Sequence, residues 1–455
     1  AHFSWGFTNS RLAQCDLYYG KNIAGKKQRI EKIKVSGGEA ISVTYVDTDY
    51  GTLISDEGSP YEVALNWTGM AKMDRTLDSL YRINTGSSIA EVKPYLKFFH
   101  TPAQNMVMAD DQGNYGFYAL GHVPIRQHSG RIAVPATPEY RWQGFIPSWE
   151  MPYVENPERG YVMNCNNLVT SRHYGYNLTR LGYDDLRAVR LSKLLKEDRR
   201  FNFEETRRIQ MDNEDQEWMV MKDVLLKTRP GSEQAKKALK ALENWDGQAN
   251  KESYEVTIYS AWQRNISAKI YQPIASTLPK WAKPVHDDFF VRNEIVNNGQ
   301  GCQSERGDCS VFLTETLDEA LQQLEETFGS SNIEKWVWTD IHYALFKNSI
   351  FKKVPGLKKY SERRANVSGT RDSLNRSRWF SSVHGFAGVE GACIRMISDL
   401  DNPYAEFAMP MGESSNIFSK HYDDLLDMWA NGEYLSMPMI DSTDQGARLV
   451  IDPSD

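Results

Sequence analysis

The feature that most constrains the fold is a change of hydrophobic period along the chain. In "IKVSGGEAISVTYV", residues 33–46, apolar and polar residues alternate on both sides of Gly37-Gly38, which predicts a β-hairpin. "NMVMADDQGNYGFYALG", residues 105–121, repeats this pattern around Gly113-Asn114. Between the two, "DRTLDSLYRI", residues 74–83, spaces its apolar residues as a helix does. The first third of the chain is therefore predicted to be mainly β-structure.

The middle of the chain is predicted to be helical. Apolar residues recur at helical spacing, on faces expected to be buried, in three segments: 184–197, 232–247 and 316–329. Ser232 is the predicted N-cap of the second segment, and Gly247 its predicted end. Thr316 and Glu319 form the predicted capping box of the third, which should stop at Gly329.

The last hundred residues return to short apolar runs broken by Gly and Pro, which are typical of strands joined by loops. The order of strands, helices and strands favours an α+β protein whose β layer takes strands from both ends of the chain. We expect one structural unit, with a β-rich part at 1–170, a mainly helical region at 171–345, and strands and loops that return to the core at 346–455.

Composition argues against two broad classes of function. The net charge is −7, and no Lys/Arg-rich run interleaves with aromatic residues, so nucleic-acid binding is not expected. Because no run of about 18 apolar residues occurs, no membrane span is expected either. The chain opens within a β-like run and shows no signal peptide, which favours a processed or truncated start.

Cysteine usage and glycosylation sequons favour an exported protein. Cys302 and Cys309 lie in a polar, Gly-rich loop and could form a disulfide. Five N-x-S/T sequons occur, although chance supplies a few in a chain of this length. Together these features favour a secreted, periplasmic or lumenal glycoprotein.

Generic catalytic motifs leave the chemistry open. The sequence has no dinucleotide-binding loop, no Walker loop, no H-E-x-x-H and no G-x-S-x-G. Paired aspartates at 110–111, 287–288 and 423–424 fit either a cation or carboxylate-pair site or ordinary loop and cap residues. Composition and spacing alone indicate an α+β protein of undetermined chemistry.

Six phrases, taken in order, resemble the β-chain of the penicillin acylase family. They are "FSWGFTN" (3–9), "CDLYYGK" (15–21), "LNWTGM" (65–70), "PAQNMVMADDQGNYGFYALGHVPIR" (102–126), "YRWQGFIPSWEMPYVENPERGYVMNCNN" (140–167) and "SKHYDDLLDMWANGEYLSMPM" (419–439). The similarity runs almost from end to end and is weakest over residues 251–385. Six phrases in register make the resemblance specific.

The resemblance implies an N-terminal-nucleophile hydrolase with a four-layer αββα sandwich. Such a protein is a zymogen that cleaves itself autocatalytically and exposes a serine at a new N-terminus. That serine attacks an amide carbonyl, and its own α-amino group acts as the base. The implied activity is that of an amidase that removes an acyl group from an amine, without a required cofactor.

The resemblance also implies roles for five residues. The oxyanion of the tetrahedral intermediate would accept hydrogen bonds from the side chain of Asn166 and the main-chain N–H of Asn9. Arg187 would organise the nucleophile's amino group and the catalytic asparagine. Trp67 and Gln104 would line the acyl pocket, where Gln104 stands in place of an apolar residue. The plainer alternatives are a buried turn asparagine at 166 and a surface arginine at 187.

Two departures from the family pattern matter. Family members often bind calcium in the segment after W-G-x-T-N. Asp16 is kept, and the Cys15 carbonyl could contribute, but Ala13 stands where an acidic ligand is expected. Because Ca²⁺ prefers six to eight oxygen ligands, we expect this metal site to be weakened or lost.

The second departure concerns the nucleophile. In the family the catalytic serine lies far upstream of W-G-x-T-N, whereas here Trp5 is the fifth residue. We therefore expect the serine and the family's α-chain to be supplied by a companion chain or segment. The alternative is a catalytically inactive, penicillin-acylase-like component used for structure or binding.

Overall fold

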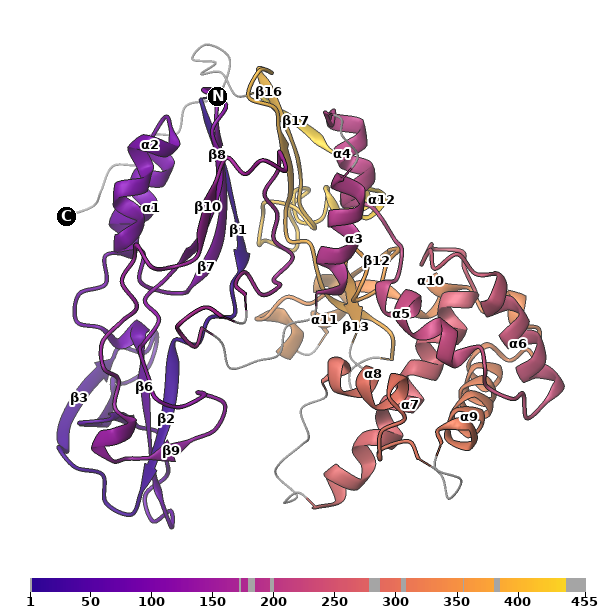
Figure 1. Cartoon of the computed structure of the whole chain (residues 1–455), viewed down its shortest axis with the longest axis horizontal. Helices are drawn as coiled ribbons and strands as arrows, with labels where there is room; N and C mark the ends of the chain where they lie inside the picture. Colours follow the sequence, from indigo (N-terminus) through magenta and orange to yellow (C-terminus); the bar gives the residue numbers. More distant parts are fainter. Residues whose placement is uncertain are drawn as a thin grey trace. The chain divides into compact units, whose positions relative to one another are not determined.

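The computed structural model describes residues 2–171, 173–178, 185–196, 200–277, 287–303, 308–354, 356–379 and 385–438. The chain divides into two compact units, Ala1–Ala188 and Val189–Asp455, which are described separately. Strands dominate the first unit, and the second combines helices with two small sheets (Figure 1). The threefold division expected from the sequence stays a prediction. Among the described residues, no helix combines the length and apolar character of a membrane span.

A four-stranded antiparallel sheet positions the candidate site in the first unit. Its strands, in spatial order, are β1 (Phe3–Asn9), β7 (Gln104–Asp110), β8 (Tyr115–Leu120) and β10 (Tyr153–Glu155). The predicted hairpin around Gly113 is confirmed as β7–β8, with Met106 opposite Tyr118. Side chains alternate between the faces of a strand, so Met106 and Met108 pack with Tyr118 and Leu120 in one buried cluster.

Helical segments cover that face of the sheet (Figure 1). They are α1 (Thr76–Thr85), α2 (Ile89–Val92) and the 3-10 helix η2 (Lys93–Phe98). Ile83, Val92 and Leu96 pack in the same cluster as the methionines. The Asp110 carboxylate accepts a hydrogen bond from Ile89 N (3.1 Å) and thereby ties α2 to the end of β7.

The second sheet of this unit has six strands. Their order is β3 (Lys27–Ile33), β4 (Ile41–Thr48), β5 (Gly51–Leu53), β6 (Glu62–Trp67), β2 (Cys15–Gly20) and β9 (Val134–Pro135). The predicted hairpin around Gly37 is confirmed, because Ile33 pairs with Ile41. Two further 3-10 turns, η1 (Thr68–Met70) and η3 (Pro138–Tyr140), follow β6 and β9.

A tryptophan-rich core packs several helices of the second unit together. Trp218, Trp262, Trp336 and Trp338 are at most 1% exposed. The helices are α3 (Leu186–Leu195, which crosses the boundary between the units), α4 (Phe203–Gln210), α5 (Gln216–Leu225), α6 (Glu233–Asn244), α7 (Glu255–Thr277), α8 (Asp288–Val296), α9 (Ser310–Phe328), α10 (Trp338–Ile341), α11 (Lys358–Ser361) and α12 (Leu426–Asn431), with 3-10 turns η4 (Ile333–Lys335) and η5 (Phe351–Lys353).

Two small sheets complete the second unit. One orders β12 (Arg363–Asn366), β11 (Tyr343–Phe346), β14 (Gly388–Gly391) and β13 (Ser377–Trp379), and the other orders β15 (Arg395–Ser398), β16 (Tyr404–Ala408) and β17 (Leu435–Pro438). Both ends of the chain contain strands, but each described sheet takes its strands from one end only, so no sheet is shared between the ends as the sequence had suggested. The expected disulfide between Cys302 and Cys309 is present.

Helix boundaries were predicted with mixed success. Ser232 caps α6 by accepting a hydrogen bond from Ala235 N, as predicted, but the helix ends at Asn244, before Gly247. The capping box at Thr316 is wrong, because α9 already begins at Ser310 and Thr316 lies buried inside it. There the Thr316 hydroxyl accepts a hydrogen bond from the Trp262 indole (3.0 Å). Gly329 ends α9 in the left-handed conformation, as predicted.

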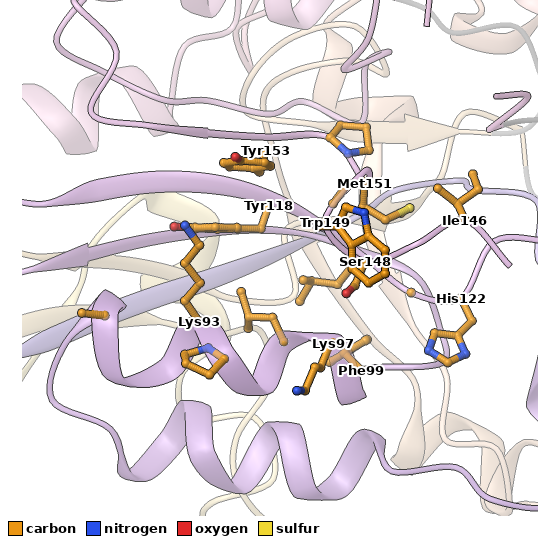
Figure 2. Close-up of a pocket in the computed structure, with 17 residues that line it drawn as sticks. Lys93, Lys97, Phe99, Tyr118, His122, Ile146, Ser148, Trp149, Met151 and Tyr153 are labelled. Carbon is orange, nitrogen blue, oxygen red and sulfur yellow. The ribbon is translucent and has the colours of Figure 1, made fainter. Parts of the chain in front are cut away.

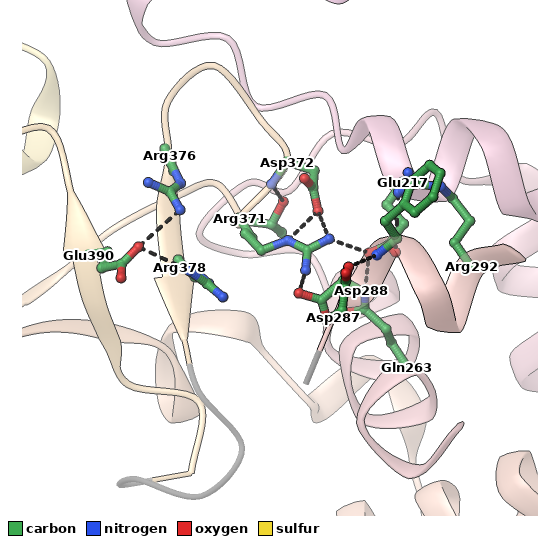
Figure 3. A network of polar contacts seen from close by, with 12 residues as sticks. Glu217, Gln263, Asp287, Asp288, Arg292, Arg371, Asp372, Arg376, Arg378 and Glu390 are labelled. Carbon is green, nitrogen blue, oxygen red and sulfur yellow. Dashed lines mark hydrogen bonds and ion pairs between the residues drawn. The ribbon is translucent and has the colours of Figure 1, made fainter. Parts of the chain in front are cut away.

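A buried acidic network ties α5 to the loop before β13 (Figure 3). Glu217 is 1% exposed, and one of its carboxylate oxygens lies 3.3 Å from Arg371 Nη2. The same carboxylate contacts Gln263 and lies 3.7 Å from Arg292. Burial is the main cause that raises the pKa of Glu217 to about 8. It also raises the pKa of Asp215, which accepts a hydrogen bond from Thr370.

Two of the paired aspartates serve as loop and cap residues, whereas Asp288 and Asp423 pair with Arg371 and Arg363. Asp110 accepts hydrogen bonds from the main-chain N–H groups of Gln112 and Asn114, inside the β7–β8 turn. Asp287 is the N-cap of α8. These roles favour the plainer of the two interpretations drawn from the sequence.

Candidate active site

The side chain of Asn164 connects the end of β1, the start of β7 and the loop that carries Asn166. Its Oδ1 accepts hydrogen bonds from Thr8 Oγ1 (2.6 Å), Asn105 Nδ2 (2.9 Å) and Asn166 N (2.8 Å). The last of these forms an Asx turn, in which a short amide side chain mimics a backbone turn. A single carboxamide oxygen therefore fixes the loop that carries Asn166 to two strands.

Asn166 has an unusual backbone conformation that aims its side chain. Its φ is 63°, in the left-handed region that asparagine tolerates better than most residues. Its Nδ2 donates to the carbonyl oxygen of Asn9 at 2.9 Å. A carboxamide has two N–H groups, so this contact uses one of them. The residue is half-buried and retains an open side toward solvent.

The two predicted oxyanion donors are therefore close together. The three bonds from the main-chain nitrogen of Asn9 to its carbonyl oxygen total about 4.2 Å. Asn166 Nδ2 consequently lies within about 7 Å of Asn9 N, close to the spacing of about 6 Å that lets two donors bond one oxygen. Asn9 is exposed and ends its strand.

Arg187 holds the other end of the same carboxamide. Its Nη2 donates to Asn166 Oδ1 (2.9 Å) and to the carbonyl oxygen of Cys165 (2.8 Å). The guanidinium thus fixes which end of the Asn166 carboxamide is oxygen, and its N–H groups must face the other way. A surface arginine would not make these contacts, so the geometry favours the organising role.

Cys165 lies between these residues but has the environment of an inert thiol. It is 8% exposed, and burial raises its pKa, while the charge of Arg187 acts in the opposite direction. Because the thiolate is the nucleophilic form, a raised pKa argues against nucleophilic chemistry at this residue.

Gln14 is hydrogen-bonded to the sequence neighbours of the two residues expected in the acyl pocket. Gln104 starts β7 opposite Asn9, whereas Trp67 ends β6 on the other sheet and is 42% exposed. The Gln14 side chain accepts a hydrogen bond from Ala103 N (2.6 Å). Its carbonyl oxygen accepts one from Thr68 N (3.0 Å). A buried glutamine therefore couples the residues that adjoin Gln104 and Trp67.

The residues expected to bind calcium do not fit that ion. Asp16 is 2% exposed and accepts a hydrogen bond from the Trp142 indole at 2.7 Å. Arg126 Nε lies 3.2 Å from the same carboxylate, and Arg126 Nη2 donates to the carbonyl oxygen of Ala13 (2.7 Å). A guanidinium thus occupies the position where Asp16 and a backbone carbonyl converge.

The charge of Arg126 and the scarcity of ligand side chains both argue against a divalent cation beside Asp16. The guanidinium already neutralises Asp16, and a second cation beside it would be repelled. Within the described ranges, no cluster of three or more His, Cys, Asp or Glu side chains is arranged to hold a metal ion. Cys15, the other expected contributor, pairs with Trp67 across the β2–β6 ladder.

The sequence profile of the family described as penicillin amidase matches residues 1–444. The chain belongs to this family. It is 23% identical to the acyl-homoserine lactone acylase QuiP of Pseudomonas fluorescens, over 93% of this chain and 55% of that protein. It is likewise 23% identical to the penicillin acylase 2 proenzyme of a Pseudomonas species, over 94% of this chain and 56% of that protein.

A solved structure confirms the fold of this penicillin amidase family member. The penicillin G acylase of Alcaligenes faecalis matches with a TM-score of 0.74 and 17% identity, over 100% of this chain and 89% of that chain. This likeness confirms the expected α+β architecture of the N-terminal-nucleophile hydrolases. The chain spans about half the length of the curated relatives above.

Sequence reasoning missed the residues that hold the others in place. Asn164 and Asn105 were not assigned a role, and neither was Gln14, although all three are buried or half-buried amides bonded between segments. The only signal for them was the crowding of three asparagines at 164–167 and of amides near β1 and β7. Spacing in the sequence cannot show which amide oxygen collects donors from three segments.

Proposed function

We propose that this chain is part of an amide hydrolase that cleaves an acyl group from an amine, with a serine nucleophile on a segment outside this sequence. The observation that carries the proposal is the Asn166 carboxamide, whose oxygen is held by Arg187 and whose nitrogen lies beside Asn9. Such an arrangement presents preset N–H donors to a charge that develops only in the transition state.

In the proposed reaction the serine hydroxyl attacks the amide carbonyl carbon, and the carbonyl oxygen becomes an oxyanion. The serine's own α-amino group would take the hydroxyl proton, and Asn9 N–H and the second Asn166 N–H would stabilise the oxyanion. The C–N bond would then break as the leaving amine takes that proton from the α-amino group. Water would release the acid from the resulting ester in a second cycle. Gln104 and Trp67 would contact the acyl group. The names of the relatives support linear amides as the substrate class.

The proposal also includes an exported location and a processed precursor. The Cys302–Cys309 disulfide fits an oxidising compartment, and one relative is named a proenzyme. Not all sequons would carry glycans, since Asn265 and Asn375 are only 7% and 6% exposed.

The test is made on the complete assembly purified from its source. We expect Edman sequencing to find one chain that begins with serine, and phenylmethylsulfonyl fluoride to add one label to that residue. If every N-terminus lacks Ser, Thr and Cys, the hydrolase proposal is wrong. The chain would then be an inactive relative that serves structure or binding.

A further inference from the structure

A cavity of about 460 Å³ in the first unit has no role in the proposed hydrolase function (Figure 2). It lies beside η2 and the end of β8, where the short strand β10 no longer covers the sheet edge. Its walls are mainly apolar and include Leu96, Phe99, Ile146, Trp149, Met151 and Tyr153. Its size and lining are those of small-molecule sites.

One wall of the cavity is apolar and yet open to solvent. Trp149 is 75% exposed and Tyr153 is 55% exposed. Large aromatic side chains left exposed around a hollow mark a binding surface more often than scattered single residues do. The buried Phe99 and Leu96 face them from η2 and its end.

The charged groups at this cavity come from one side. Lys93 and Lys97 lie four residues apart on η2 and both line it (Figure 2). Lys93 forms an ion pair with Glu155 (2.5 Å), whose carboxylate also accepts a hydrogen bond from Tyr118 Oη (2.6 Å). In the part of the chain that the structure describes, Lys97 has no carboxylate within ion-pair distance. Among the described residues, the ammonium of Lys97 is therefore a positive charge at the rim without a carboxylate partner.

A histidine also lines the cavity, on the side of Lys97. The His122 ring contacts the main chain of Lys97, and it lies 3.8 Å from the ring of His100, centroid to centroid. Burial, and then the neighbouring histidine, lower the pKa of His122. Apart from Lys93, which is paired with Glu155, an incoming ligand would thus meet the cation of Lys97 and a largely apolar lining.

We propose that this cavity binds a small monocarboxylate with an apolar body. The carboxylate pairs with Lys97, and the hydrocarbon lies between Phe99 on one side and Trp149 and Met151 on the other. The inference goes beyond the proposed hydrolase function, because the residues proposed for catalysis do not line this cavity. A binding assay tests it whether or not the assembly hydrolyses amides.

The test is isothermal titration calorimetry of the complete assembly with octanoate and with octan-1-ol. We expect octanoate to bind with a Kd of about 1 mM, which is typical of so small a ligand. Lys97→Ala should weaken octanoate about three- to fivefold, as for an exposed charge pair, and leave octan-1-ol unchanged. The matched control is Lys32→Ala, an exposed lysine on the other sheet.

A second variant tests the location independently of charge. Ala90 is exposed on α2 and lines the cavity, so Ala90→Trp should fill the opening without disturbing the core and abolish binding of both ligands. Absence of octanoate binding to the unmodified assembly overturns the proposal. Equal binding in Ala90→Trp, or an equal loss of octanol affinity in Lys97→Ala, also overturns it.

Discussion

At the scale of single residues, the candidate site depends on which way one carboxamide points. Arg187 holds Asn166 Oδ1, so the N–H groups face Asn9. Asn166→Asp replaces these donors by a second acceptor of nearly the same shape. Loss of an oxyanion donor costs about 100- to 1000-fold in kcat, and we expect that loss with little change in KM. Steady-state kinetics of the assembly measure it, and the exposed helix residue Asn84, changed to Asp, is the control.

Asn164 allows a sharper prediction, because among the described residues only the oxygen of its side chain is hydrogen-bonded. Oδ1 accepts three hydrogen bonds, whereas Nδ2 is buried without a partner among the described residues. Asn164→Ala should therefore destabilise the assembly by about 1–3 kcal/mol and lower kcat. Asn164→Asp keeps the acceptor Oδ1 but buries a second carboxylate oxygen in the place of Nδ2, so it should restore only part of the stability and of kcat. Thermal unfolding and kinetics check this, and equal damage by the two changes would contradict the role assigned to Oδ1.

The buried ion pair between Arg126 and Asp16 should contribute strongly to thermal stability. The Arg126 side chain is 1% exposed beside Asp16, which is 2% exposed. Removing one partner of a buried pair costs about 3–5 kcal/mol, so Arg126→Ala should strongly lower the melting temperature. Arg141→Ala is the control, since its pair with Asp49 is exposed and such pairs contribute about 0–1 kcal/mol.

The same reasoning predicts the response to a chelator. Because a guanidinium supplies the positive charge at Asp16, EDTA should leave the melting temperature of the assembly unchanged and added calcium should not raise it. A ligand that binds only the native state must raise stability. A calcium-dependent rise that disappears in Asp16→Asn would show that a metal does bind there.

Residue roles could be predicted only in part. Asn166, Arg187 and Asn9 were predicted from resemblance, and the structure brings them together, although their catalytic roles stay proposals. Asn164 and Gln14 could not be found that way, because their importance lies in hydrogen bonds between distant segments. Asp16 was expected to be a weakened metal ligand, and Arg126 was not foreseen as its partner, because the two are far apart in sequence.

At the scale of elements, the junction between α5 and the loop at 370–372 should make stability depend on pH. The pKa of Glu217 is about 8 in the folded protein and near 4.3 in an unfolded chain. Between these values the native state binds more protons than the unfolded state. The unfolding free energy should therefore fall as the pH rises from about 5 to 8.

Glu217→Gln separates this effect from other titrations. Glutamine keeps the shape and stays neutral, so the variant should lose less stability than the wild type between pH 6 and pH 9. Urea unfolding of the assembly at both pH values measures the difference. The control is Glu233→Gln on the exposed start of α6, which should follow the wild type. An unchanged pH dependence in Glu217→Gln would show that Glu217 is ionised throughout.

Periodicity predicted elements well where local signals and packing agree. The β7–β8 hairpin and the N-cap of α6 follow the sequence. The capping box in α9 failed because the apolar residues upstream, including Leu313, extend the buried face by two turns and override a local signal. The apolar face predicted for residues 184–197 is also less buried than expected, because Ala188 alone is buried within α3. An apolar stripe alone does not show what covers it.

At the scale of the whole molecule, the apolar side of α1 is left uncovered by the described residues of the first unit. Leu77 and Tyr81 are 79% and 64% exposed on one side of α1, and Met73, just before the helix, is 74% exposed. The other side of α1 packs through the buried Ile83. A contiguous exposed apolar surface marks an interaction site, and relatives are about twice as long as this chain. We therefore expect the companion segment to cover this surface.

Leu77→Glu tests this expectation. Burying a leucine contributes about 1.5–3 kcal/mol, so placing a charge there should weaken association of the chain with its companion by at least about tenfold. Co-expression followed by size-exclusion chromatography measures the assembled fraction. Ile350→Glu is the matched control, because Ile350 is 70% exposed but lies in the second unit. If both variants assemble as well as the wild type, the companion binds elsewhere, and the α1 surface must be explained by another partner.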